Sequence, residues 1–305
     1  MRRSLAVVLV AIAIVAPVYA IYPPPASPAI AATDQTAQLV STLRWNVDAD
    51  WFGGFSGIEV TADGQTFFAV TDRGHIVRGT VRRDADQLTA MDVVDVQPLV
   101  DKNGEIQEFP HNDAEGLALD DLGRLNVSFE HAHRVLRYDT WGGQAKWPSY
   151  TRTWRALSGN KGLEMVAVDE DGDLYAIPEA AAPDATKAWV YRRLQGKKWD
   201  QPFTLPLTPD FLPVGGDIGP DGRLYLLERA FSAYGFRTQI RRMTVTDVGF
   251  DNIETLLQTP VRRHDNVEGL AVWADADGNM RMILVSDDNF LPFLRTEVIE
   301  YVVQE

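Results

Sequence analysis

Short apolar runs separated by glycine turns repeat along the chain from Phe55 to its C-terminus. Each turn lies between two apolar runs, which is the pattern of a β-hairpin. The turns recur about fifty residues apart, a period typical of β-propellers whose blades each contain four antiparallel strands. No amphipathic segment of helical length interrupts the pattern, so it predicts an all-β propeller. The five turns are Asp63-Gly64, Leu122-Gly123, Asp171-Gly172, Asp221-Gly222 and Asp277-Gly278.

One motif occurs twice, each time leading into an apolar run. The stretch from His111 to Ala118 reads HNDAEGLA, and the stretch from His264 to Ala271 reads HDNVEGLA. Such internal similarity indicates that one supersecondary unit is repeated along the chain. The two copies are therefore expected to occupy equivalent places in two blades.

The apolar runs before the glycine turns are predicted to be the innermost strands of the blades. In the second blade, Thr151–Leu157 is predicted to be the fourth strand. The last blade lacks an outer strand, and we expect the strand-like segment Gln38–Trp45 to supply it and close the ring. This gives five blades, although six remain possible because blades of about 45 residues also fit the chain. The predicted inner strands are Gly57–Val60, Gly116–Leu119, Leu163–Val168, Gly216–Gly219 and Gly269–Trp273.

The composition is that of a folded acidic protein. Hydrophobic residues make up 45% of the chain and charged residues 24%, while the formal net charge is −14. This charge repels nucleic acid and anionic lipid, so neither is an expected partner. Because the sequence has no cysteine, disulfides do not stabilise the protein, and its stability must come from the core, to which a bound metal can add.

The N-terminus has the features of a secretory signal peptide. Arg2 and Arg3 precede an apolar stretch, and Val18-Tyr19-Ala20 resembles a cleavage site. An uncleaved anchor is the alternative, but the apolar stretch is shorter than the roughly twenty residues that span a bilayer. We therefore expect a signal peptide (1–20), a flexible leader rich in Pro and Ala (21–36) and a single propeller domain (37–305). The mature protein is expected to be periplasmic or secreted, monomeric and without a membrane span.

Acidic residues gather at one edge of the predicted blades. The first two strands of a blade are antiparallel, so residues that open the first strand lie beside residues that follow the second. Clustered carboxylates repel one another, and a divalent cation, most suitably Ca²⁺, offsets that cost. Any single carboxylate here is more often a cap for backbone amides, but the repeated position favours a shared site. The candidate metal ligands are Asp72, Glu115, Glu130, Glu164, Glu179, Glu228, Glu268, Asp287 and Asn289.

Histidines and arginines lie in the same loops and are the candidate catalytic residues. His111 and His264 occupy equivalent positions of the repeated motif, which favours a shared role as general base or ligand. Taken singly, each is better explained as a histidine of a surface loop. Arginines can hold a phosphate or carboxylate oxygen opposite a metal. No serine-nucleophile motif, phosphate loop or dinucleotide fingerprint occurs, so metal-assisted hydrolysis is the predicted chemistry. The set is His111, His133, His264, Arg73, Arg134 and Arg229.

Motifs along most of the chain resemble the bacterial family called esterase-like activity of phytase, or phytase-like. They include Thr71-Asp72-Arg73-Gly74, Asp113-Ala114-Glu115-Gly116-Leu117, Ser128-Phe129-Glu130, Gly162-Leu163-Glu164, Leu227-Glu228-Arg229, Asn266-Val267-Glu268-Gly269-Leu270 and Val285-Ser286-Asp287-Asp288-Asn289-Phe290. The resemblance implies an exported β-propeller that hydrolyses phosphoesters or other esters of small molecules. It implicates the charged residues of these motifs without assigning their roles.

Two other functions fit the same pattern. A lactonase-type propeller would also hold one divalent ion among carboxylates and Asn. A non-catalytic propeller would use the same face to bind a ligand or a partner.

Overall fold

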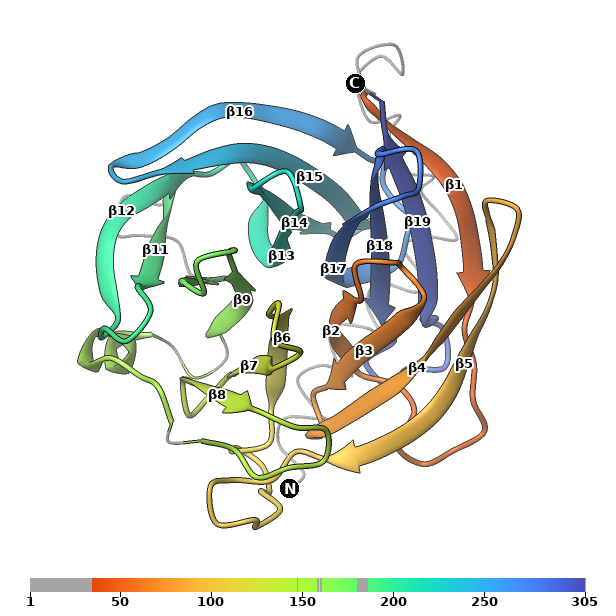
Figure 1. Cartoon of the computed structure of the whole chain (residues 1–305). Coiled ribbons are helices and arrows are strands. Elements are labelled where there is room, and N and C mark those ends of the chain that lie inside the picture. The colour runs from red at the N-terminus through yellow and green to blue at the C-terminus, as the bar shows by residue number, and fades with distance from the viewer. Residues whose placement is uncertain (1–34, 147, 158, 160, 180–185, 305) are drawn as a thin grey trace.

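The fold is a propeller of five antiparallel sheets arranged around a central axis (Figure 1). The structure is a computed structural model, and it describes residues 35–146, 148–157, 159, 161–179 and 186–304. The predicted signal peptide and residues 21–34 of the predicted leader lie outside the described residues. The prediction of an all-β, five-bladed propeller is confirmed.

Blades 1 to 4 follow one another along the chain, each running outward from the axis. Blade 1 contains β2 (Phe55–Val60), β3 (Thr66–Thr71), β4 (His75–Asp84) and β5 (Gln87–Pro98), and blade 2 contains β6 (Ala114–Leu119), β7 (Leu125–Phe129) and β8 (Arg134–Tyr138). Blade 3 contains β9 (Leu163–Val168), β10 (Leu174–Pro178), β11 (Lys187–Arg193) and β12 (Asp200–Pro206). Blade 4 contains β13 (Leu212–Ile218), β14 (Arg223–Ser232), β15 (Gly235–Thr246) and β16 (Gly249–Gln258).

Blade 5 combines the two ends of the described chain. It contains β17 (Asn266–Ala274), β18 (Met280–Asp287), β19 (Glu297–Val303) and, at its outer edge, β1 (Ala37–Arg44). Strands β1 and β19 pair antiparallel, with Ala37 opposite Val303 and Arg44 opposite Glu297. The N-terminal strand therefore closes the ring as the sequence predicted.

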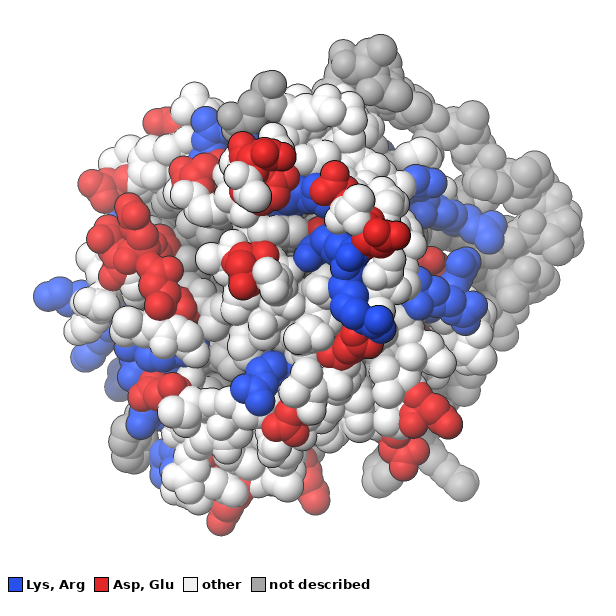
Figure 2. All heavy atoms as spheres, turned by 45° about the vertical axis from the view of Figure 1, so that its right-hand side comes forward, with Lys and Arg blue, Asp and Glu red and all other residues white. Residues whose placement is uncertain are grey.

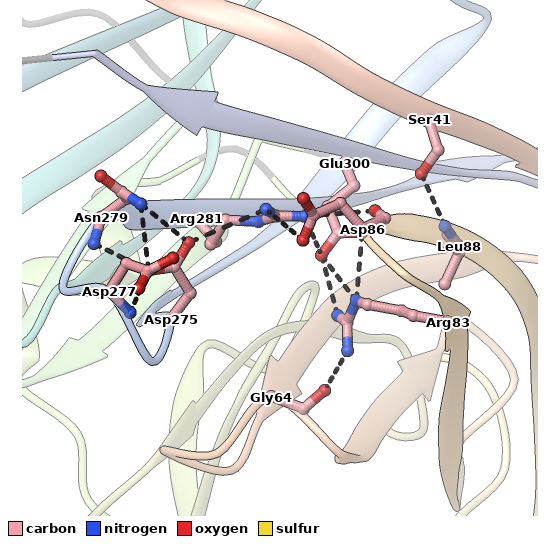
Figure 3. A network of polar contacts seen from close by, with 10 residues as sticks. All are labelled: Ser41, Gly64, Arg83, Asp86, Leu88, Asp275, Asp277, Asn279, Arg281 and Glu300. Carbon is pink, nitrogen blue, oxygen red and sulfur yellow. Dashed lines mark hydrogen bonds and ion pairs between the residues drawn. The ribbon is translucent and has the colours of Figure 1, made fainter.

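Buried polar contacts hold blade 5 against blade 1 (Figure 3). The Glu300 side chain is fully buried and accepts a hydrogen bond of 2.9 Å from Arg83 Nε. A second guanidinium, that of Arg281, lies 3.6 Å from the same carboxylate. Nearby, the Leu88 amide of β5 donates to Ser41 Oγ of β1 at 3.1 Å. The contact between blade 5 and blade 1 is thus held by residues from opposite ends of the chain.

Glycines allow the inner strands to meet at the axis. A Cβ on Gly116 would lie 2.8 Å from the carbonyl oxygen of Glu164, and one on Gly57 would lie 2.9 Å from that of Glu115. Gly269 is in similarly close contact with the backbone of β2. No side chain fits at such distances, so the glycine of the repeated Glu-Gly-Leu motif is required where adjacent blades touch backbone to backbone.

The hydrophobic core lies between neighbouring blades. One cluster joins Ile58 and Val77 of blade 1 to Ile283 of blade 5, and another joins Val135 of blade 2 to Ala176 of blade 3. Each sheet is therefore apolar on both faces, which explains why most inner strands are continuous apolar runs instead of alternating ones.

The structure differs from the predicted strands chiefly in blades 2 and 4. The predicted strand Thr151–Leu157 is wrong, because the chain forms the 3₁₀ helix η2 (Arg152–Ala156) there. Trp154 of this helix and Leu157, which follows its last residue, are three positions apart, and both pack into the blade 2–blade 3 core. Among the described residues, blade 2 consequently has a three-stranded sheet. In blade 4, the inner strand begins at Leu212, earlier than predicted.

No helix among the described residues is long and apolar enough to cross a membrane. Acidic and basic side chains are interspersed over the face shown in Figure 2.

Candidate functional site

Carboxylates from four blades converge at one end of the axis. They lie where inner strands begin and second strands end, as Asn266 of β17 and Asp287 of β18 illustrate by pairing directly. Burial raises the pKa of Glu115 well above its ordinary range, and the nearby Glu164 and Asp113 raise it further. The pKa of Asp287 is raised in the same way, first by burial and then by Glu268. We call this group the acidic ring: Asp72, Asp113, Glu115, Glu130, Glu164, Glu179, Glu268 and Asp287.

Three residues of blade 2 form the tightest group of possible metal ligands. His131 Nδ1 lies 3.1 Å from Glu130 Oε2 and 3.5 Å from Asp113 Oδ2. One ligand atom from each residue falls within 4.8 Å of the others. The Gly162 amide of blade 3 donates to Glu130 Oε1 at 3.0 Å and so fixes that carboxylate. Asp113 and His131 were not among the predicted ligands, although both lie within or beside the predicted motifs.

Arg229 links the acidic ring across blades 3, 4 and 5. Its guanidinium donates to Glu179 Oε1 at 3.1 Å, to Asn266 Oδ1 at 2.5 Å and to Glu268 Oε1. Asn266 Nδ2 also donates to Glu268 Oε1, at 2.9 Å. Burial alone would lower the pKa of Arg229, but Glu268, Glu179 and Glu164 outweigh it and hold the pKa above its ordinary value. Blade 4 thus contributes a cation where the other blades contribute carboxylates.

On the blade 1 side, Asp72 has a carboxylate oxygen that no described residue satisfies. Its Oδ1 atom is buried without a hydrogen-bond partner. Burial and the Asp113 carboxylate raise the pKa of Asp72 to about 7. An orphaned oxygen among surplus carboxylates fits a hard divalent cation, which prefers oxygen ligands. The donor set of the acidic ring therefore suits such an ion.

A hollow of about 500 Å³ opens beside Arg229 and Glu268. Strands β14 and β15 are long and carry Phe231 and Phe236, whose rings lie 5.0 Å apart, to its wall. Phe231 is 66% exposed. Predicted ligand Asn289 also lines this hollow. The hollow thus presents an apolar wall and an acidic wall, which suits a small molecule with both polar and apolar parts.

Glu228 does not reach the acidic ring. It is fully buried and accepts hydrogen bonds of 2.6 Å from both Nε and Nη2 of Arg241. Gln239 donates to it as well, at 2.8 Å. Successive side chains of a strand point to opposite faces, so Arg229 faces the ring while Glu228 faces away. The prediction of Glu228 as a metal ligand is corrected to a structural ion pair.

The two repeated histidines occupy different environments. His111 is exposed, whereas His264 is buried with its Nε2 atom 2.6 Å from the Tyr301 hydroxyl. Their equivalent sequence positions therefore do not give them a shared site. In blade 5 the third strand, β19, places Tyr301 against the His264 ring, whereas in blade 2 the third strand, β8, contacts only the His111 carbonyl oxygen among the described contacts, through Arg134.

The remaining predicted residues lie around the acidic ring in fixed positions. His133 is adjacent to Glu130, since a Cβ on Gly162 would lie 2.7 Å from atoms of both. The Arg134 guanidinium stacks on Phe129 at 4.2 Å and donates to the carbonyl oxygens of Ala132 and His111. On the blade 1 side, the guanidinium of Arg73 stacks over the Phe290 ring at 3.1 Å.

We expect His264 to make stability pH-dependent in a defined window. Burial lowers its pKa from 6.5 to about 4, so the folded state keeps the imidazole neutral where the unfolded state takes up a proton. The free energy of unfolding is therefore at its full value above pH 6.5. It falls by up to about 3 kcal/mol as the pH drops from 6.5 towards 4, because protonation of this histidine then favours the unfolded state. The variant His264→Gln should show a shallower fall of the urea midpoint across this window. Parallel pH profiles for the two proteins would contradict the assignment.

Distant likenesses to solved propeller structures are found along most of the chain. The PQQ-bound aldose sugar dehydrogenase of Streptomyces coelicolor matches with a TM-score of 0.45 and 12% identity, over 92% of this chain and 100% of that chain. A luciferin-regenerating enzyme matches with a TM-score of 0.46 and 11% identity, over 87% of this chain and 97% of that chain. The Pan2 WD40 domain of Neurospora crassa matches with a TM-score of 0.45 and 9% identity, over 89% of this chain and 97% of that chain. These likenesses are too distant to inform function.

No curated protein matches the chain. The family model described as "Phytase-like: Esterase-like activity of phytase" matches residues 50–290, which include all five inner strands and the whole acidic ring. The chain therefore belongs to the phytase-like family.

Proposed function

We propose that the protein is an exported hydrolase that cleaves an ester bond, either phosphoric or carboxylic, with the help of a divalent cation, Ca²⁺, held by the acidic ring. The observation that carries the proposal is the convergence of buried carboxylates from four blades with one cation, Arg229, bonded among them. Such a surplus of buried negative charge is costly unless protons or a metal compensate it. Membership of a family described by esterase-like activity supports the same reading.

Side chains at different positions of the acidic ring would have different roles. Asp113 and Glu130 would hold the cation through their carboxylate oxygens, together with the neighbouring Glu115 and Glu164. His131 contacts both Asp113 and Glu130 and would orient them. When bound, a divalent cation supplies Lewis acidity that polarises an ester. The hydrogen bonds of Arg229 orient Glu268 and Glu179 at the edge of the hollow.

The hollow would bind and orient the substrate. Leu212, Phe231 and Phe236 offer contacts for its apolar part, while Asn266 and Asn289 offer amides to its polar part. An apolar wall also excludes water from one side of the reacting bond, which strengthens electrostatic interactions there.

The test is an activity and stability assay with and without metal. We expect turnover of at least one substrate among phosphomonoesters, phytate, simple carboxylic esters and lactones in the presence of Ca²⁺, and loss of turnover in chelator. Metal analysis should find bound divalent ion, and chelator should lower the melting temperature because a metal bound only by the folded state stabilises it by mass action. Absence of metal-dependent turnover, together with an unchanged melting temperature, would reject the proposal.

A further inference from the structure

A second pocket lies between blades 2 and 3, away from the acidic ring. It has a volume of about 310 Å³ and is lined by Asn126, Val135, Arg137, Lys146, Ser149 and Arg193. Asn126 precedes Glu130 by four residues, so along the extended strand it lies about 13 Å from the ring end of β7. The pocket opens beside β8, where blade 2 has no fourth strand among the described residues and isolated bridges connect Ala145 and Ser149 to β8.

The pocket carries a surplus of positive charge in an acidic protein. Arg137 Nε donates to Asp139 Oδ1 at 2.8 Å, and Lys146 Nζ lies 3.3 Å from Asp139 Oδ2. One carboxylate therefore serves two cations. Among the described residues, the partner of the Arg193 guanidinium is the Ser149 hydroxyl, at 3.0 Å, and no carboxylate pairs with it. Burial lowers the pKa of Arg193, and the nearby Arg137 guanidinium lowers it further because the two positive charges lie close together.

Two neutral side chains add hydrogen-bond donors to the pocket. Asn126 is 3% exposed, yet no hydrogen bond of its side chain is found in the part of the chain that the structure describes. Its amide atoms are not among the fully buried polar atoms that lack a partner, so they are open to the pocket and can bond a ligand there. Ser149 Oγ already accepts hydrogen bonds from Arg193 and from Trp199 Nε1, at 3.0 and 2.6 Å. Its own proton is therefore left to donate.

We propose that this pocket binds the phosphate group of inorganic phosphate or of a small phosphomonoester. Arg137, Lys146 and Arg193 minus Asp139 leave two positive charges, which match a dianion. The donors come from several directions, as a tetrahedral oxyanion requires, and guanidinium groups suit its paired oxygens. The volume admits a phosphate group with a small substituent. This site is separate from the proposed ester hydrolysis, which takes place at the acidic ring.

Calorimetric titration of the purified protein with inorganic phosphate tests the proposal. Chelator is present throughout, so that metal at the acidic ring cannot bind the anion. We expect one phosphate per chain, competition by sulfate but not by chloride, and a rise in melting temperature with phosphate. Glycerol phosphate in a parallel titration distinguishes the two sources, because the tighter ligand identifies whether the free anion or its ester is preferred.

Variants identify the pocket. Arg193→Gln should weaken phosphate binding by about tenfold or more, because it removes a charge-assisted hydrogen bond. Asn126→Leu should also weaken binding while leaving the phosphate-free melting temperature unchanged or raised, since the amide has no protein partner to lose. Arg82→Gln makes the same charge change at an exposed ion pair with Asp92 and should bind phosphate normally.

Three results would overturn the proposal: no phosphate-dependent heat or melting shift, an equal effect of chloride, or equal binding by all three variants. A loss of stability in Asn126→Leu without phosphate would show that the amide is structural. The two variants remove different groups, a neutral amide and a charged guanidinium. If one of them misfolds, the phosphate affinity of the other still tests the pocket.

Discussion

Replacing Glu268 with Gln is expected to lower kcat/KM for the metal-dependent reaction by at least about 100-fold. Glu268 raises the pKa of Asp72, Glu115, Glu164 and Asp287, so its carboxylate lies near the centre of the acidic ring. It lines both the hollow and the narrow space along the axis. Gln keeps the shape and an acceptor for Arg229 and Asn266 but removes the negative charge that attracts a cation.

The same variant should respond to metal in a way that damage to the fold would not reproduce. Without metal, Glu268→Gln should be as stable as the unaltered protein or more so, because one of several mutually repelling carboxylates is gone. The rise in melting temperature on adding Ca²⁺ should shrink. Glu297→Gln, a half-buried carboxylate at the start of β19, is the matched control and should keep both activity and the response to Ca²⁺. Full activity in Glu268→Gln would remove the acidic ring from the mechanism.

Replacing Glu228 with Gln is expected to cost about 3–5 kcal/mol of unfolding free energy while leaving the bound metal content unchanged. The two partners are almost completely buried, with side-chain exposures of 6% for Arg241 and 0% for Glu228. Removing one charge leaves the other buried without compensation. Equilibrium urea unfolding measures the loss, and metal analysis of the same preparation shows whether Glu228 takes part in the acidic ring.

The double variant Glu228→Gln, Arg241→Met provides the control. Removing both charges should recover much of the stability, because the cost of the single variant comes from the unpaired guanidinium. If the single variant unfolded normally but lost its metal, Glu228 would be a ligand after all and the orientation of β14 would have to differ from the one described.

The positions of Asp72, Glu115, Glu130 and Glu164 at a common end follow from strand order alone. Their strands are antiparallel neighbours around an axis, so the ends of the strands determine where these residues lie. Glu228 and Arg229 are adjacent in one strand, and only one of them can face the axis. The sequence contains no local signal for which one does, because the choice depends on Arg241 in the next strand and on Glu179 and Glu268 in other blades.

Asp113 and His131 were missed as possible ligands because the sequence does not show that they approach Glu130. Both lie in stretches that the sequence marks as functional, but their approach to Glu130 depends on a turn in which His131 adopts a φ of 53°. A positive φ at a non-glycine residue is uncommon and has no dependable sequence signal.

By itself, the sequence determined the propeller and the closing N-terminal strand and favoured five blades over six, because glycine turns and apolar runs are local features that repeat. Only the tertiary structure decided which charged residues meet at the acidic ring, which are buried as ion pairs, and where blade 2 leaves a pocket. These outcomes depend on contacts between residues far apart in the chain, such as Arg229 with Glu179 and Arg193 with Ser149. A pattern of single positions cannot specify such pairs, since each is fixed by the packing of one blade against the next.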